Sequence, residues 1–212
     1  MKTVPPIREI EKIEKMKEIL KAQNPRNYIL FLLGIYLGRR ISDILKFKAK
    51  DLHGKELITI KEQKTGKTIT IMFHPELKKA LDEYLQDKDP EEYVIGSREY
   101  TEYITIKEKV FDPKTNRKKS VAKKIKNTAP NSPISRVQAW NILNDAAKQV
   151  GINQIGCHST RKTFGLFLYQ KDKDIAVVQE LLNHNFSSTA STRRYIGLTQ
   201  IEMNNAVCGL PY

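Results

Sequence analysis

The motif HSTR, at residues 158–161, carries the first chemical signal in the chain. It places His158 and Arg161 three positions apart at the expected start of a helix. Residues at that spacing lie on one side of a helix, and the amide dipoles of a helix start favour an anion. The pair therefore suits a phosphate group. Taken alone, a packed or capping histidine beside a solvated arginine is the better-supported interpretation.

A second stretch, LLNHNFSSTASTRRYIG, covers residues 181–197 and contains His184 and Tyr195. A tyrosine hydroxyl attacks phosphorus only after losing its proton, and its ordinary pKa of about 10 means that a cationic field or a base must assist. A buried amphipathic aromatic is the alternative for Tyr195. Arg40, two residues after Gly38 in GRRISDIL, is uninformative by itself because an arginine near a glycine bend is common.

The charge balance indicates the class of partner. The chain has 212 residues, with 37 Lys and Arg against 24 Asp and Glu, a net charge of +13 and a pI of about 9.6. Clustered cations gain affinity for phosphates by releasing counterions, so nucleic acid is expected first and an anionic membrane surface second. Cys157 and Cys208 lack CxxC spacing and no secretory segment is evident, which favours a reducing cytoplasm without disulfides or a zinc site.

Hydrophobic spacing predicts a mainly helical chain with a small antiparallel sheet. A first helix is expected from residue 6 to a stop at Asn24. A second, from 26 to 37, is expected as a core helix because it is too short to span a bilayer. Gly38 breaks it, and another helix is expected to follow. ELITIKEQ and TITIMF, separated by KTGK, predict a hairpin. EYVIGS is expected as a further short strand. Other helices are expected at 76–86, 136–150 with Ser135 as its cap and Gly151 as its end, 159–170, 175–184, 191–196 and 199–209.

Residues 98–131 are the least regular part of the sequence, with the basic clusters NRKKS and AKKIK between prolines. A hairpin that includes YITIKEKVF is one option. We expect a mobile basic excursion rather than a domain, with lysines that meet phosphates or solvent.

The order of the candidate groups resembles the catalytic signature of the tyrosine recombinases, the phage integrase family. The family's first box reads G-L-R-I-S-E-L, and GRRISDIL is similar to it with Arg39 in the leucine position. HSTR matches the H-x-x-R box, and LLNH followed by RRYIG resembles the box that runs from L-G-H to R-Y. The resemblance extends from about residue 7 to about residue 205. It implies a mainly α catalytic domain with a small antiparallel sheet, and these site residues: Arg40, Lys64, His158, Arg161, His184 and Tyr195.

The chemistry of phosphodiester cleavage agrees with these roles. Negative charge develops on the nonbridging oxygens, and the planar guanidinium groups of Arg40 and Arg161 suit bidentate stabilisation of it. The resemblance implies that Tyr195 is the nucleophile and that His184 donates to the phosphate. His158 is then the expected proton acceptor or helps to orient one, no metal or cofactor is required, and the acid for the departing 5′ oxygen is Lys64.

Some alternatives stay open. Lys61 and Lys67 rival Lys64, which is preferred because family hairpins often read K-T-G with the first lysine catalytic. Tyr169 and Tyr212 are rival nucleophiles, although Tyr169 lies in an apolar helix that indicates core. Arg39 could contact the DNA backbone. The chain departs from the family at three places: Lys162 stands where histidine is frequent, Asn183 replaces a glycine, and the stretch from residue 184 to residue 195 is a couple of residues longer than usual.

The resemblance also implies the domain organisation and the partners. Residues 1–212 are expected to form a single catalytic domain without a separate N-terminal core-binding domain, either as an excised domain or as a short form. The expected partners are double-stranded DNA and further copies of the chain in a tetramer, with neither membrane nor small-molecule cofactor. The tail helix at 199–209 would dock on a neighbouring copy or pack in cis. The setting is the cytoplasm of a bacterial, phage or archaeal host cell. The competing function is a DNA-binding accessory or regulatory protein with the same fold and no strand exchange.

Overall fold

A computed structural model of the protein describes residues 4–61, 66, 68–97, 103–112, 117–126, 132–156, 158–182 and 192–193. Within the strands at 103–112 and 117–126, side chains are described only at 120–123. The predictions for Lys64, His184 and Tyr195, and for the tail helix at 199–209, therefore lie outside the described residues.

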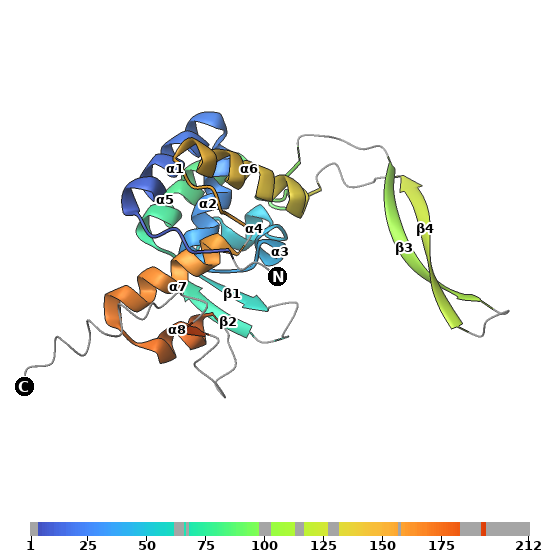
Figure 1. Ribbon diagram of the computed structural model, residues 1–212. Coiled ribbons are helices and arrows are strands. Elements are labelled where there is room, and N and C mark those ends of the chain that lie inside the picture. Colours follow the sequence, from blue (N-terminus) through green and yellow to red (C-terminus); the bar gives the residue numbers. More distant parts are fainter. Residues whose placement is uncertain are drawn as a thin grey trace, which may run out of the picture.

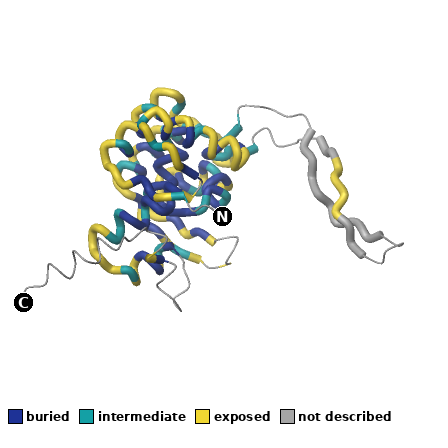
Figure 2. The backbone as a smooth tube through the Cα atoms, viewed as in Figure 1, coloured by how far each residue is buried: buried dark blue, intermediate teal, exposed yellow. Residues whose placement is uncertain are grey.

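The helix α2 (Pro25–Leu37) is the centre of the body. Pro25 opens it, and the Asn24 side chain accepts a hydrogen bond of 3.0 Å from the amide of Arg26. Its apolar residues are buried along most of its length, as Figure 2 shows, because other helices pack around it. The prediction of a core helix is confirmed. The helices in contact with α2 are α1 (Ile10–Gln23), α3 (Ile41–Ile44), α5 (Pro75–Leu85), α6 (Arg136–Gln149) and α7 (Ser159–Asp172).

The remaining elements of the body are short. The strands β1 (Leu57–Lys61) and β2 (Thr68–Met72) form the predicted antiparallel hairpin, in which Ile58 pairs with Ile71 and Ile60 pairs with Ile69. These isoleucines share one face of the ladder and pack on the core, while the other face is exposed. Two short helices complete the described body, α4 (Ala49–Leu52), which the sequence analysis did not predict, and α8 (Ile175–Leu181).

Two expectations differ from the structure. EYVIGS is no regular strand: its backbone makes isolated bridges at Tyr93 and Gly96, because its neighbours are a short turn and a proline segment rather than a second strand. Within 98–131, the described residues form a regular ladder instead of an irregular excursion, which confirms the option of a hairpin that includes YITIKEKVF. The strands β3 (Tyr103–Asp112) and β4 (Arg117–Lys126) pair antiparallel along their whole length, and Figure 1 shows them standing away from the helices.

A polar network ties three helices of the body together. The buried Lys17 on α1 donates to Glu76 at the start of α5 (2.7 Å) and to the Tyr36 hydroxyl on α2 (3.1 Å). Burial alone would raise the pKa of Glu76, but hydrogen bonds from Lys17 and Tyr36 outweigh it and hold that pKa below its usual value. Burial raises the pKa of Tyr28, which also donates to Glu76, to about 12. The carboxylate of Glu76 therefore acts as the shared acceptor that fixes α5 against α1 and α2.

Within the described part of the chain, no helix is both long enough and apolar enough to cross a bilayer.

Candidate active site

Gly34 in α2 and Gly38 at its C-terminal cap let α7 approach closely enough to bring the GRRISDIL and HSTR boxes together. A Cβ atom at Gly34 would lie 2.8 Å from the Cβ of Thr160, and one at Gly38 would lie 2.3 Å from the Phe164 ring. The glycines are four residues apart, as are Thr160 and Phe164, so one turn of each helix packs on one turn of the other. Gly38 also has a φ of +60°, a left-handed conformation that glycine adopts without strain. The segment after α2 is thereby held against the start of α7.

The H-x-x-R box lies at that start. His158 occupies the cap position of α7 and is exposed, and its side chain makes no capping hydrogen bond to the helix. Arg161 is one turn further on and only 2% exposed. Its guanidinium donates to the main-chain carbonyl of Leu182. Because His158 is exposed and makes no capping hydrogen bond, its interpretation as a packed or capping residue does not hold.

The two arginines of the first box have different surroundings. Arg40 caps the start of α3 and is half-buried. Arg39 is fully buried, and its side chain donates to the carbonyls of Leu37 (3.0 Å) and Leu181. The suggestion that Arg39 could contact the DNA backbone is therefore wrong, because its guanidinium is used inside the fold. Of the two, Arg40 is the arginine that solvent and a substrate can reach.

Arg39 and Arg161 converge on the C-terminal end of α8. They donate to consecutive carbonyls, those of Leu181 and Leu182, which belong to the last turn of the helix and its cap. Carbonyls at a helix end lack partners within the helix, and arginine side chains are suitable donors to them. The two contacts fix the point from which the chain continues to His184, two residues beyond. Thr192, three residues before Tyr195, is fully buried, so the chain returns to the body there.

Asp43 was not among the residues that the sequence pattern singled out. This residue lies one turn after Arg40 on α3 and is 4% exposed, and neither carboxylate oxygen has a hydrogen-bond partner among the described residues. It lines a cavity of about 500 Å³ together with residues of β1, the strand that leads to the tip containing Lys64. Buried polar groups are nearly always paired, so a buried carboxylate without a partner among the described residues is unusual. An acidic residue three positions after the arginine was the available signal.

The remaining candidate residues, and the residues that rival them, lie in different parts of the chain. Lys61, one of the rivals of Lys64, ends β1 and is exposed; Lys67 and Tyr212 lie outside the described residues, as do Lys64, His184 and Tyr195 themselves. Tyr169 packs against the cluster of Val178 and Leu182 between α7 and α8, which agrees with its interpretation as core. Burial lowers the pKa of Lys162, the residue in the family's histidine position. Among the described residues, no group of three or more His, Cys, Asp or Glu side chains could hold a metal ion.

The family model for the phage integrase family matches residues 8–201. The chain belongs to the phage integrase family. This match confirms the family expected from the ordered boxes, and with it the interpretation of the chain as a tyrosine-type DNA strand transferase of the integrase and recombinase class.

Individual relatives agree with this membership. The chain is 38% identical over 200 residues to the probable integrase/recombinase YoeC of Bacillus subtilis, with 94% of this chain and 93% of YoeC covered. It is 25% identical over 210 residues to the tyrosine recombinase XerA of Pyrococcus furiosus, and the match covers 97% of this chain and 62% of that XerA. The chain therefore spans nearly all of YoeC but less than two thirds of that XerA.

Solved structures share the fold. A crystal structure of XerA recombinase superimposes with a TM-score of 0.67 at 19% identity, covering 99% of this chain and 68% of that one. The catalytic domain of bacteriophage HP1 integrase gives a TM-score of 0.56 at 15% identity, covering 99% of this chain and 96% of that one. The expected fold class, mainly α with a small antiparallel sheet of the recombinase catalytic type, is confirmed.

Proposed function

We propose that this phage integrase family member is a site-specific recombinase that cleaves and rejoins DNA through a covalent 3′-phosphotyrosyl link to Tyr195. The observation that carries the proposal is the convergence of three boxes at the end of α8. The buried Arg161 meets the segment of Arg39 and Arg40 there, and the chain proceeds directly to His184. A cationic site assembled around a helix end fits the negative charge that a phosphodiester develops under attack.

The proposed step transfers the phosphate from the DNA strand to Tyr195. The Tyr195 oxygen forms a bond to phosphorus, and the bond from phosphorus to the 5′ oxygen breaks. The phenolic proton passes to His158, which is exposed at the start of α7, and the departing 5′ oxygen takes a proton from Lys64. The phosphate then remains linked to the tyrosine, so a 5′ hydroxyl from another strand can reverse the step without ATP.

The arginines and the second histidine stabilise the charge in this proposal. Arg40 and Arg161 donate to the nonbridging oxygens, and His184 adds a third donor. A guanidinium has several N–H donors, so the contact from Arg161 to the Leu182 carbonyl orients the group and is compatible with donation to a phosphate. Because the Arg161 side chain is buried, its charge is poorly screened by water and acts strongly on a nearby oxyanion.

The partners follow from this reaction. Two duplexes cleaved at two positions each need four active sites, so we propose double-stranded DNA and a tetramer of the chain as the working assembly. Structures related in fold include a recombinase bound to its DNA substrate and a lambda integrase tetramer on a Holliday junction. Residues 1–212 act as one catalytic domain in this scheme, in the cytoplasm where the DNA of the host cell lies.

Trapping of the covalent intermediate tests this function. A pool of nicked duplexes with randomised sequence lets the short cleaved strand diffuse away, so that the protein stays linked to the longer strand. The wild-type chain should give a band resistant to denaturation and Tyr195→Phe should not, while both bind DNA equally. Intact DNA binding without any adduct from the wild-type chain would instead identify an accessory protein that keeps the fold without strand exchange.

A further inference from the structure

The hairpin of β3 and β4, called the long hairpin below, is the largest feature that the active site does not use. Each strand has ten residues, and at about 3.3 Å per residue the ladder is about 30 Å long. Figure 1 shows it standing apart from the helical body. An isolated two-stranded ribbon is marginally stable in water, so a ladder of this length indicates a surface that is completed by a partner.

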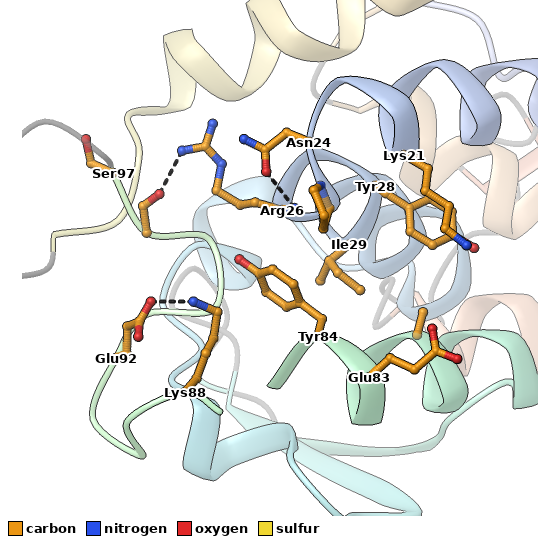
Figure 3. A pocket seen from close by; sticks show the side chains of 13 residues that line it. Lys21, Asn24, Arg26, Tyr28, Ile29, Glu83, Tyr84, Lys88, Glu92 and Ser97 are labelled. Atoms are coloured by element: carbon orange, nitrogen blue, oxygen red, sulfur yellow. Dashed lines mark hydrogen bonds and ion pairs between the residues drawn. The ribbon is translucent and has the colours of Figure 1, made fainter. Parts of the chain in front are cut away.

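The body fixes the point at which the chain leaves for the long hairpin and returns from it. Its two legs are joined by hydrogen bonds from the Ser97 amide to the Ser132 carbonyl (2.7 Å) and from the Ile134 amide to the Ile95 carbonyl (3.0 Å). Ile95 and Ile134 are buried in the core. As Figure 3 shows, Arg26 in the first turn of α2 reaches across a cavity of about 530 Å³ and donates to the Gly96 carbonyl (2.8 Å). The hairpin therefore emerges from a defined point.

That point is remote from the active site. Arg26 is at the start of α2 and Arg40 follows its end, and the 13 residues of the helix span about 20 Å.

The register of the ladder sorts its residues into two unlike faces. Residues directly opposite each other share a face, and faces alternate along each strand. On one face, Lys107 pairs with Ala122 and Lys109 with Ser120. That face holds no acidic position. The other face combines acidic, basic and β-branched positions, among them Val121, which is 39% exposed. The five lysine positions of the first face, called the lysine face, are Lys107, Lys109, Lys118, Lys124 and Lys126.

The positive charge of the two strands indicates a polyanionic partner. The two strands have eight Lys and Arg against two Asp and Glu, a net charge of +6 out of the +13 of the whole chain. Like charges close together on one face of a ladder destabilise it, and a polyanion removes that repulsion. One turn of duplex DNA is about 34 Å long, close to the length of the ladder, and the major groove is wide enough to admit a two-stranded ribbon.

We propose that the long hairpin is a second DNA-binding element. It lies along about one helical turn of the duplex, with its lysine face toward the phosphates. This inference rests on the proposed action on duplex DNA and extends it to contacts outside the cleavage point. These contacts are to the backbone, so they add affinity and a larger footprint without reading sequence.

The salt dependence of binding tests the proposal with matched variants. The first carries Lys107→Gln, Lys109→Gln and Lys124→Gln on the lysine face. The control carries Arg117→Gln, Lys119→Gln and Lys123→Gln on the other face, and so loses the same charge. Binding is measured on a random-sequence duplex of about four helical turns over a range of salt concentrations. Each phosphate contact contributes about 0.9 to the slope of log K against log salt, so the lysine-face variant should reduce the slope by about 2 to 3 units and the control by less than about 1.

Equal slopes for the two variants would overturn the proposal, because net charge rather than the lysine face would then be responsible. A third variant joins Ser97 to Ser132 through a two-residue turn in place of residues 98–131, and it should lose at least as much slope while unfolding at the wild-type temperature. A wild-type slope in this variant would also overturn the proposal.

The cleavage reaction is tested separately from the long hairpin. At saturating nicked duplex the control variant, with its changes on the other face, should form the wild-type amount of adduct. If the wild-type chain forms none, the proposed function fails, while the slopes still decide the role of the long hairpin.

Discussion

The buried guanidinium of Arg39 donates a hydrogen bond to the main-chain carbonyl of Leu181, 142 residues further along the chain. In the family this position of the first box is usually leucine. In this chain the position holds a charged donor at the end of α8, next to the carbonyl that Arg161 uses. The described start of the third box, at Leu181, is thereby tied to a residue of the first box.

Arg39→Leu restores the family residue and tests that dependence. A hydrogen bond from a charged group contributes about 1.5 to 3 kcal/mol, so we expect a thermal midpoint lowered by several degrees and a reduced rate of adduct formation. Arg40→Leu is the matched control, with a midpoint near the wild-type value and no adduct. If Arg39→Leu formed adduct at the wild-type rate, the contact with Leu181 would have no part in assembling the site.

Gly38→Ala tests the close approach of α2 and α7. The added methyl group would overlap the Phe164 ring at a residue that also requires positive φ, so we expect a loss of about 2 to 4 kcal/mol in the free energy of unfolding. Gly54→Ala is the control, because Gly54 has a φ of +68° with open space around it. Urea unfolding of both variants separates the overlap from the backbone strain. A loss no larger for Gly38→Ala than for Gly54→Ala would show that α7 adjusts freely.

Asp43→Asn removes the unpaired charge and keeps the shape of the side chain. A buried carboxylate without a partner costs stability, so the thermal midpoint should stay the same or rise. Adduct formation should fall about tenfold or more if the carboxylate orients a cation of the active site in the DNA complex. Asp51→Asn, in the same cavity, serves as the control. A lower midpoint together with full activity would make Asp43 a structural residue only.

Glu76→Gln tests the network of α1, α2 and α5 by pH. Because the pKa of Glu76 is lower in the folded chain than its unfolded value of about 4.3, its contribution is present above that value and is lost as the pH falls through the folded pKa. Urea unfolding should show a free energy of unfolding that is lower by roughly 1 kcal/mol at pH 7, a figure discounted for the partial exposure of Glu76. This free energy should also fall less between neutral and acidic pH than it does in the wild type. The exposed Glu83→Gln should leave both unchanged. An unaltered acid dependence in Glu76→Gln would contradict the ion pair with Lys17.

Sequence patterns predicted most helix boundaries, because a helix begins and ends according to the residues at its own ends. Pro25 after Asn24, the cap at Ser135 and the left-handed Gly151 each mark a helix boundary that the structure shows. EYVIGS failed because its apolar residues Val94 and Ile95 are buried as parts of a connecting segment, and burial alone does not distinguish such a segment from a strand.

The order of the candidate site residues along the chain could be predicted from the sequence, but the contacts that bring their segments together could not. The order of the boxes identified the family, whereas the functions of Arg39 and Asp43 depend on contacts between distant segments. An arginine next to another arginine gives no sign of which one is buried, since the buried Arg39 makes its contact with Leu181, which is far away in the sequence. Likewise, the alternation in YITIKEKVF suggested a hairpin, but only the register divides its lysines between two faces.

The identity of the nucleophile is the central claim, and mapping the trapped adduct tests it most directly. After digestion of the adduct with the wild-type chain, tandem mass spectrometry should locate the phosphodeoxynucleotide on Tyr195. Tyr195→Phe should abolish the adduct, and Tyr169→Phe and Tyr212→Phe should not. An adduct that persists in Tyr195→Phe, or one that maps to Tyr169 or Tyr212, would contradict the account.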